Sequence, residues 1–127
     1  MKPTEPLELL REWVAAINAE DAERVLSLYH EDAVLLPTFS AEVYLGAENI
    51  QRYFAHVYTN DRVWVGLLEK TISVQDIGDG RFVLGGLYNW EIEKEGDVRK
   101  PEARFTFCVD MNNPCSILHH HSSVLPG

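Results

Sequence analysis

Residues 103–123 read ARFTFCVDMNNPCSILHHHSS, and this stretch does most to decide the fold. Runs of β-branched and aromatic residues lie on both sides of a turn at Asn112-Asn113-Pro114, which predicts an antiparallel pair of strands. The pair brings Arg104 and the histidine triplet of residues 119–121 into one sheet. Cations and imidazoles are costly to bury unless they are paired or hydrogen-bonded, so internal partners or a ligand must hold this group.

The residues before this stretch extend the sheet. From about Val63 the chain is rich in β-branched and aromatic residues, with further turns at Gly78-Asp79-Gly80 and Glu95-Gly96-Asp97. Three turns predict four long antiparallel strands between residues 63 and 123. Gly85-Gly86, inside the second of them, predicts a bulge or sharp bend that would curl the sheet.

The first half of the chain predicts three helices and one short strand. Apolar side chains recur at helical spacing in three groups, Leu10, Trp13, Val14 and Ile17, then Ala22, Val25, Leu26 and Tyr29, then Ile50, Tyr53, Phe54 and Val57. Asp21 is the expected cap of the second helix, and residues 33–36 form a short strand stopped by Pro37. The expected class is therefore α+β, with three N-terminal helices packed on the concave face of a strongly curved, mainly antiparallel sheet.

Composition narrows the classes of function. The length of 127 residues suits one domain spanning residues 1–127. A formal net charge of -9 opposes binding to nucleic acid or to anionic membranes, because both require basic surface. Without a long apolar run or an apolar signal segment, the sequence predicts a soluble, cytoplasmic protein. We expect no cofactor.

Strand parity divides the residues of the stretch between two faces. Ala103, Phe105, Phe107 and Val109 share one face, and the other face carries Arg104, Thr106, Cys108 and Asp110. If helices cover only one side of the sheet, the phenylalanines and Trp90 would form an exposed aromatic surface. This surface predicts a homodimer, or a larger homo-oligomer, joined through the sheet.

The histidine triplet alternates in the same way. His120 should point with Ser122 into a pocket, where it is the best candidate for an acid, a base or a hydrogen-bond donor. His119 and His121 should point the other way, toward the subunit interface. They would need a third ligand to bind a metal, and no Cys or carboxylate spacing supplies one, so no metal site is expected.

The two cysteines, Cys108 and Cys115, lie on opposite sides of the turn at residues 112–114. A hairpin closing near Met111 and Asn112 would place them face to face, which would permit a disulfide. In a cytosolic protein two reduced thiols are the expected state.

Several segments resemble the nuclear-transport-factor-two-like superfamily, also described as SnoaL-like or cystatin-like. They are NAEDA at residues 18–22, LYHEDAV at 28–34 and GAENI at 46–50. The ending, ARFTF at 103–107 and HHHSS at 119–123, is more specifically similar to the association domain of calcium/calmodulin-dependent protein kinase II and its stand-alone bacterial relatives. No kinase catalytic motif or calmodulin-binding helix accompanies it.

The resemblance implies homo-oligomers whose subunits hold a carboxylate on arginines, in a cavity between helices and sheet. Arg104 matches the strand arginine of that family and is expected on the helix-facing side. Serine stands at position 122, where the kinase domains usually have a second arginine, and no arginine stands near Gly85-Gly86. The alternative for Arg104 is an internal ion pair with Glu91 or Glu102.

Three functions remain open. The first is an oligomerising association or small-molecule-binding module for a polar or carboxylate-bearing ligand, with the ligand residues Arg104, His120, Ser122, Asn89, Tyr29 and Trp13. The second is a cofactor-independent SnoaL-like or ketosteroid-isomerase-like enzyme, an isomerase, cyclase or hydrolase, that uses His120 or Asp32 as a base on a small hydrophobic substrate. The third is a purely structural assembly domain.

Overall fold

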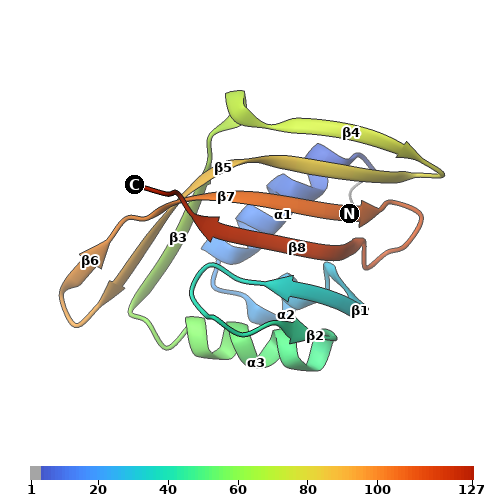
Figure 1. Ribbon diagram of the computed structural model, residues 1–127. Coiled ribbons are helices and arrows are strands. Elements are labelled where there is room, and N and C mark those ends of the chain that lie inside the picture. Colours follow the sequence, from blue (N-terminus) through green and yellow to red (C-terminus); the bar gives the residue numbers. More distant parts are fainter. Residues whose placement is uncertain (1–3) are drawn as a thin grey trace.

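Within residues 4–127, the computed structural model has three α-helices, one 3-10 turn and eight strands (Figure 1). The helices and the turn are α1 (Pro6–Asn18), α2 (Ala22–Leu26), α3 (Ala47–Val57) and η1 (Glu69–Thr71). The strands are β1 (Tyr29–Leu36), β2 (Tyr44–Leu45), β3 (Arg62–Leu67), β4 (Ser73–Gly78), β5 (Arg81–Lys94), β6 (Asp97–Arg99), β7 (Glu102–Asp110) and β8 (Ile117–Val124).

All the strands belong to one sheet, in the order β2-β1-β8-β7-β5-β3, with β4 and β6 also paired to β5. The pairing of β1 with β8 is parallel, and the other pairs are antiparallel. The long strand β5 pairs with β7 over residues 81–89, and its other edge pairs first with β4 and then with β3.

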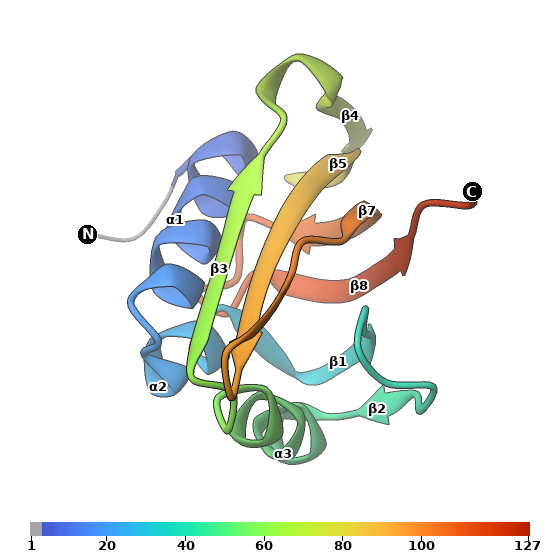
Figure 2. The ribbon, with the colours of Figure 1, turned by 90° about the vertical axis from the view of Figure 1, so that its left-hand side faces the viewer.

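The sheet curves around the helices and forms a half-barrel (Figure 2). Helix α1 lies against the concave face, and its C-terminal end is fixed to β3 by Asn18, whose side-chain amide donates to the Val65 carbonyl (2.9 Å) and accepts from the Val65 N–H (2.8 Å). The α+β prediction is therefore confirmed. Among residues 4–127, no helix has the length and apolar character needed to cross a membrane.

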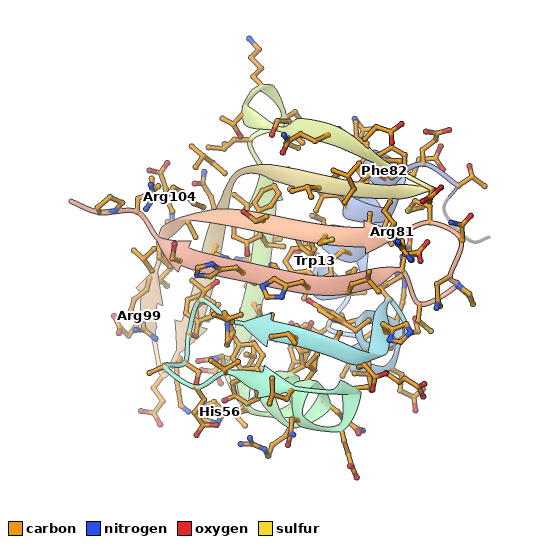
Figure 3. The ribbon with its side chains drawn as sticks, turned by 45° about the vertical axis from the view of Figure 1, so that its right-hand side comes forward. Trp13, His56, Arg81, Phe82, Arg99 and Arg104 are labelled. Carbon is orange, nitrogen blue, oxygen red and sulfur yellow. The ribbon has the colours of Figure 1, made fainter. Side chains whose placement is uncertain are left out.

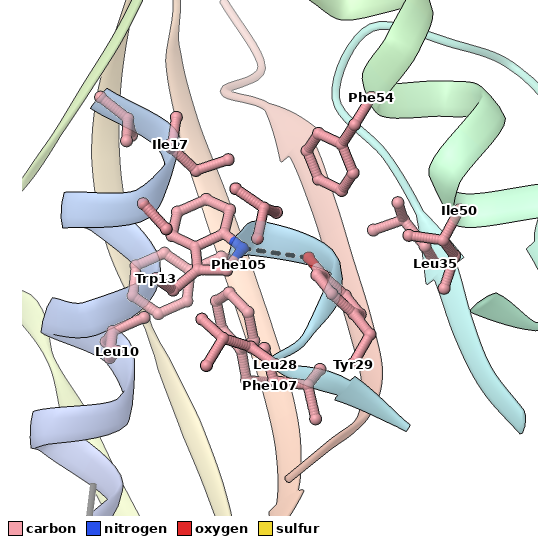
Figure 4. Packing of buried hydrophobic residues seen from close by; sticks show 14 of the residues in the cluster. Leu10, Trp13, Ile17, Leu28, Tyr29, Leu35, Ile50, Phe54, Phe105 and Phe107 are labelled. Carbon is pink, nitrogen blue, oxygen red and sulfur yellow. Dashed lines mark hydrogen bonds between the residues drawn. The ribbon is translucent and has the colours of Figure 1, made fainter. Parts of the chain in front are cut away.

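An aromatic core fills the space between α1 and the sheet. Trp13, 1% exposed, stacks on Tyr88 at 5.7 Å between ring centroids and meets Phe107 edge-on at 5.3 Å. Figure 4 shows Trp13 reaching from α1 toward Phe105 and Phe107 on β7. Burial of each such side chain contributes about 1.5–3 kcal/mol, so this contact dominates the packing of helix on sheet.

The core corrects the prediction of an exposed aromatic interface. Phe105, Phe107 and Trp90 are only 2–5% exposed, because α1 covers the face of β7 that carries the odd-numbered residues. The face left open carries Arg104 and Thr106 instead. The odd-numbered residues of β7 do share one face, as predicted, but the helices cover this face and not the opposite one.

Two element boundaries also differ from the prediction. Helix α2 ends at Leu26, and Tyr29 begins β1, where it pairs with Ile117 of β8 and is buried in the core. Asp21 does cap α2, since its carboxylate accepts from the Arg24 N–H at 3.1 Å. The first of the four predicted long strands is broken by η1 into β3 and β4, and the third by Lys100-Pro101 into β6 and β7.

Gly85-Gly86 marks a change of partner along β5 rather than a bulge. The register between β5 and β7 runs unbroken through Gly85↔Thr106 and Gly86↔Phe105, while the other edge passes from β4 to β3 just beyond Gly85. A Cβ on Gly86 would lie 3.1 Å from Phe105 Cζ and 3.2 Å from Ile72 Cα. The close approach of Ile72 and Phe105 therefore favours glycine at position 86.

The two adjacent glycines give a matched test of this packing. Gly86→Ala should lower the free energy of unfolding by about 1–3 kcal/mol, because backbone at residue 72 must move. The urea concentration at the midpoint of unfolding should be the same for Gly85→Ala as for wild type, or slightly higher. The added Cβ would make only ordinary contacts, at 3.5 and 3.6 Å. Urea unfolding at one protein concentration measures both, and equal losses would contradict the assignment.

Candidate functional site

The structure separates the predicted ligand residues onto two sides of the sheet. His120, Ser122, Tyr29 and Trp13 are 1–4% exposed on the helix side. Arg104 is exposed on the outer face, and Asn89 is half-buried there. The prediction of one pocket holding all six residues is therefore wrong, and so is the expectation that Arg104 faces the helices. The register explains the result, because Arg104 lies opposite Ser123 on β8, not opposite Ser122.

On the inner side, four side chains form a buried hydrogen-bonded chain. Trp13 Nε1 donates to the Tyr29 hydroxyl at 3.1 Å, and that hydroxyl lies 2.9 Å from His120 Nδ1 (Figure 4 draws the first of these bonds). The other ring nitrogen, His120 Nε2, lies 3.2 Å from the Tyr88 hydroxyl. Phe107 stacks on the imidazole at 3.8 Å between centroids. Both imidazole nitrogens therefore have partners inside the protein.

These surroundings favour neutral His120. Burial, with smaller contributions from His119 and His121, lowers the pKa of His120 to about 3. Burial also raises the pKa of Tyr29 and of Tyr88, so both phenols stay protonated. A neutral imidazole offers one donor and one acceptor, which is what two hydroxyl groups require. The cluster is thus satisfied internally.

Little space remains beside this cluster. The cavity lined by Tyr88, His120 and Ser122 has a volume of about 10 Å³, close to the least that holds one water molecule. Thr38 closes it from the loop after β1 through a hydrogen bond to the Ser122 hydroxyl. Asp32 is exposed on β1, away from this cavity. The two candidate bases, His120 and Asp32, therefore do not meet at a substrate-sized space.

On the outer face, Arg104 lies in an open depression of about 500 Å³. Its polar lining includes Thr71, Thr106, His121 and Ser123. Figure 3 shows Arg104 and Arg81 at opposite ends of the long strands. Arg81 forms an ion pair with Asp110 at 3.6 Å, and Arg62 forms one with Glu91 at 3.1 Å. Within residues 4–127 Arg104 has no ion pair, so the predicted internal pair with Glu91 or Glu102 is absent there.

The outer residues around Arg104 form what we term the central strip. It consists of consecutive outward-facing positions in the middle of three strands: Val83, Gly85 and Leu87 on β5, Arg104, Thr106 and Cys108 on β7, and His119, His121 and Ser123 on β8. These nine positions hold no Asp or Glu, and on β7 the strip is bounded by Glu102 at one end and Asp110 at the other. The strip also places His119 and His121 on the face opposite His120, as parity predicted.

A second depression, of about 530 Å³, continues the outer face toward the other end of the strands. Trp64, Asn89, Glu91, Lys100 and Glu102 are part of its lining. Trp64 is 38% exposed, and its ring lies over Gly66. Asn89 Oδ1 is buried and has no hydrogen-bond partner among the described residues. An unpaired acceptor therefore lies beside an exposed aromatic ring.

Neither cysteine is bonded to the other. Cys108 lies opposite His119, and Cys115 lies in the loop before β8, so the predicted face-to-face arrangement does not occur. A bulge between Cys108 and Val109 shifts the register of this hairpin. Within residues 4–127, no three His, Cys, Asp or Glu side chains gather closely enough to hold a metal ion.

Sequence reasoning missed Trp64 and Thr38 as residues of these sites. Trp64 alternates with Val63 and Val65, both buried, so strand parity by itself would have placed its ring on the outer face. Thr38 follows Pro37 in a loop, and its contact with Ser122 spans 84 positions of sequence. No local pattern indicates such a contact.

Comparison with known proteins identifies the family. The profile described as "Calcium/calmodulin dependent protein kinase II association domain" matches residues 3–126. The chain belongs to this association-domain family. A candidate member from Xanthomonas campestris is 30% identical, with a TM-score of 0.84, over 98% of this chain and 94% of its own. The resemblance suggested by the sequence is thereby confirmed.

More distant structures share the fold of this association domain. A ketosteroid isomerase-like protein from Erwinia carotovora atroseptica is 12% identical, with a TM-score of 0.77, over 95% of this chain and 94% of its own. A nuclear transport factor 2-like superfamily protein from Salmonella enterica is 14% identical, with a TM-score of 0.79, over 94% and 88%. No curated protein matches the sequence.

Neutral His120 should make stability depend on pH. The unfolded histidine titrates near 6.5 and the native one near 3, so between these values only the unfolded state binds the proton. This contribution to stability is complete above pH 6.5 and is lost as pH falls toward 3. From pH 7.5 to 5 the free energy of unfolding should drop by about 2 kcal/mol on this account.

The test compares urea unfolding of wild type and His120→Gln across that range. The variant should be less stable at pH 7.5 but should lack this part of the pH dependence. His56→Gln, at an exposed position of α3, should keep the wild-type slope. If the free energy of unfolding of His120→Gln fell with pH as steeply as that of wild type, the buried imidazole would not be the cause of the pH dependence.

Proposed function

We propose that this chain is a homo-oligomerising association module whose subunits meet through the outer face of the sheet. The observation that carries the proposal is the central strip, a surface without Asp or Glu on a strongly acidic chain. Membership of a family described as an association domain supports it. This proposal moves the predicted interface from Phe105, Phe107 and Trp90 to the opposite side of the same strands.

Electrostatics explains why the strip matters. Two copies, each with a formal charge of -9, repel one another, and carboxylates buried at their contact would add a desolvation cost. Depletion of charged residues is typical of the core of a protein interface. The strip carries neutral, aliphatic and imidazole side chains together with one arginine. It is therefore the part of the outer face best suited to contact a second copy.

The outer face is also large enough. Six strands spaced at about 4.8 Å span about 29 Å across the sheet, and the nine residues of β7, at about 3.4 Å each, span about 31 Å along it. A standard interface buries roughly 800 Å² on each partner. Since β2 has only two residues and the sheet is curved, a contact that uses most of this face is the one that reaches that size.

The hypothesis of a SnoaL-like or ketosteroid-isomerase-like enzyme has less support than that of an association module. A base acting on a small hydrophobic substrate needs an apolar pocket of several hundred Å³ next to it. His120 has about 10 Å³ beside it, and both its nitrogens are engaged by tyrosines. Distant resemblance to a ketosteroid isomerase-like structure concerns the fold, and one fold carries many functions.

A charge placed in the middle of the strip should separate the subunits. Thr106 is exposed at the centre of β7, and Thr106→Glu would bring carboxylates into the contact. We expect at least a tenfold rise in the dissociation constant, by about 1.4 kcal/mol or more, measured by sedimentation equilibrium. Gln51→Glu makes the same change in charge on exposed α3 and should associate like wild type. Unchanged association of Thr106→Glu would rule out this face.

The depression around Arg104 favours a second candidate function, binding of a small carboxylate. Arg104 offers a planar set of donors, with the Thr106 and Ser123 hydroxyls and the His121 imidazole lining the same space. In this hypothesis the ligand-binding residues lie on the outer face around Arg104, and the predicted ligand residues His120 and Ser122 are no longer part of the set. An arginine without a partner in the described chain is the specific reason for keeping the hypothesis.

Calorimetric titration with acetate, malonate, succinate and benzoate tests this function. At least one should bind saturably to the dissociated wild-type chain, in which Arg104 has no partner copy, and the binding should disappear in Arg104→Ala, because no other arginine or lysine lines the depression. His120→Gln should leave the binding unchanged, since that residue lies on the other side of the sheet. Absence of binding by every member of the panel would count against the hypothesis.

A further inference from the structure

We infer that, in the associated form, Arg104 of one copy pairs with Glu102 of a second copy across a two-fold axis, so that the carboxylate held by Arg104 comes from the partner chain. The inference rests on the proposed association through the outer face and specifies its register. It is carried by three features of the two outer depressions: their charges, their spacing and their unpaired polar atoms.

The charges of the outer face differ along the strands. The half that includes the central strip has Arg104, His119 and His121, and its carboxylate, Asp110 at the end of β7, is paired with Arg81. Beyond Arg104, the next outward positions are Glu102 on β7, and Asn89 and Glu91 on β5. Glu91 is paired with Arg62, and Lys100 lines the same depression, so Arg104 and Glu102 are the neighbouring opposite charges that have no ion pair among residues 4–127. A head-to-head contact of two such faces would be repulsive, and a contact turned by 180° is complementary.

A two-fold axis makes each contact occur twice, with residue i meeting residue j and residue j meeting residue i. Arg104 and Glu102 are two positions apart on the same face of β7, about 7 Å along the strand. An axis through the point between them would bring each arginine over the glutamate of the partner. The same rotation lays the central strip of one copy over the Trp64 depression of the other.

The two depressions are similar in size, and the carboxylates Glu91 and Glu102 line only the second of them. The one around Arg104 has a volume of about 500 Å³ and the one around Trp64 about 530 Å³. Within residues 4–127, Glu102 has no ion pair, and Asn89 Oδ1 in the same depression is a buried acceptor without a donor. An arginine entering there would meet a carboxylate, an amide oxygen and the exposed face of an indole, which are three groups that bind guanidinium.

A charge-swap experiment tests this pairing. Arg104→Glu should raise the dissociation constant at least about tenfold, because two carboxylates would then face each other at each of the two equivalent contacts. Glu102→Arg should do the same, although it lowers the net negative charge of the chain. The double variant Arg104→Glu/Glu102→Arg restores opposite charges and the original net charge, and its dissociation constant should return to within about threefold of wild type. Sedimentation equilibrium measures all four proteins, and circular dichroism confirms that each is folded.

The outcomes separate this register from the association itself. If Thr106→Glu dissociates the protein while both single swaps associate like wild type, the face is correct and the register is overturned. If both single swaps dissociate and the double variant stays dissociated, the pairing of Arg104 with Glu102 is likewise overturned. If wild type is monomeric throughout, the proposed function fails and the inference fails with it.

Discussion

The contact on which the rest of the structure depends is the packing of Trp13 against the inner face of β5 and β7. Trp13 stacks on Tyr88 and meets Phe107 edge-on, and it holds the Tyr29 hydroxyl that in turn reaches His120. Because side chains alternate along β7, fixing Phe105 and Phe107 under α1 sends Arg104 and Thr106 to the opposite face. One choice of face therefore determines both the core and the surface available to a partner.

The buried imidazole belongs to this core rather than to an open active site. His120 is neutral, is stacked on Phe107 and has a tyrosine hydroxyl at each ring nitrogen. A buried polar network with every member satisfied adds rigidity and fixes the packing of its surroundings, whereas an unsatisfied one is costly. The space beside His120, between the helices and the sheet, is occupied by side chains and has room for about one water molecule.

The outer face has the opposite character, with polar groups that the described chain leaves without partners. Arg104, Glu102 and Asn89 Oδ1 lie along one surface, and none of the three has a partner among the described residues. These donors and acceptors complement one another and support the proposed contact with a second copy, in which each copy would supply what the other lacks. Membership of the association-domain family accords with this interpretation.

Local patterns in the sequence were sufficient for the α+β class, the three helices, the hairpin turns, the Asp21 cap and the separation of His120 from His119 and His121, because helical and strand periodicities are properties of neighbouring residues. Local patterns did not predict which distant segments pair with one another. That Tyr29 begins a strand, that Thr38 closes over Ser122 and that Arg104 points away from the helices all depend on which face α1 covers. Parity allowed either face of β7 to be buried. Only the tertiary structure decided between them, because the side with Phe105 and Phe107 is the one that can fill the space around Trp13.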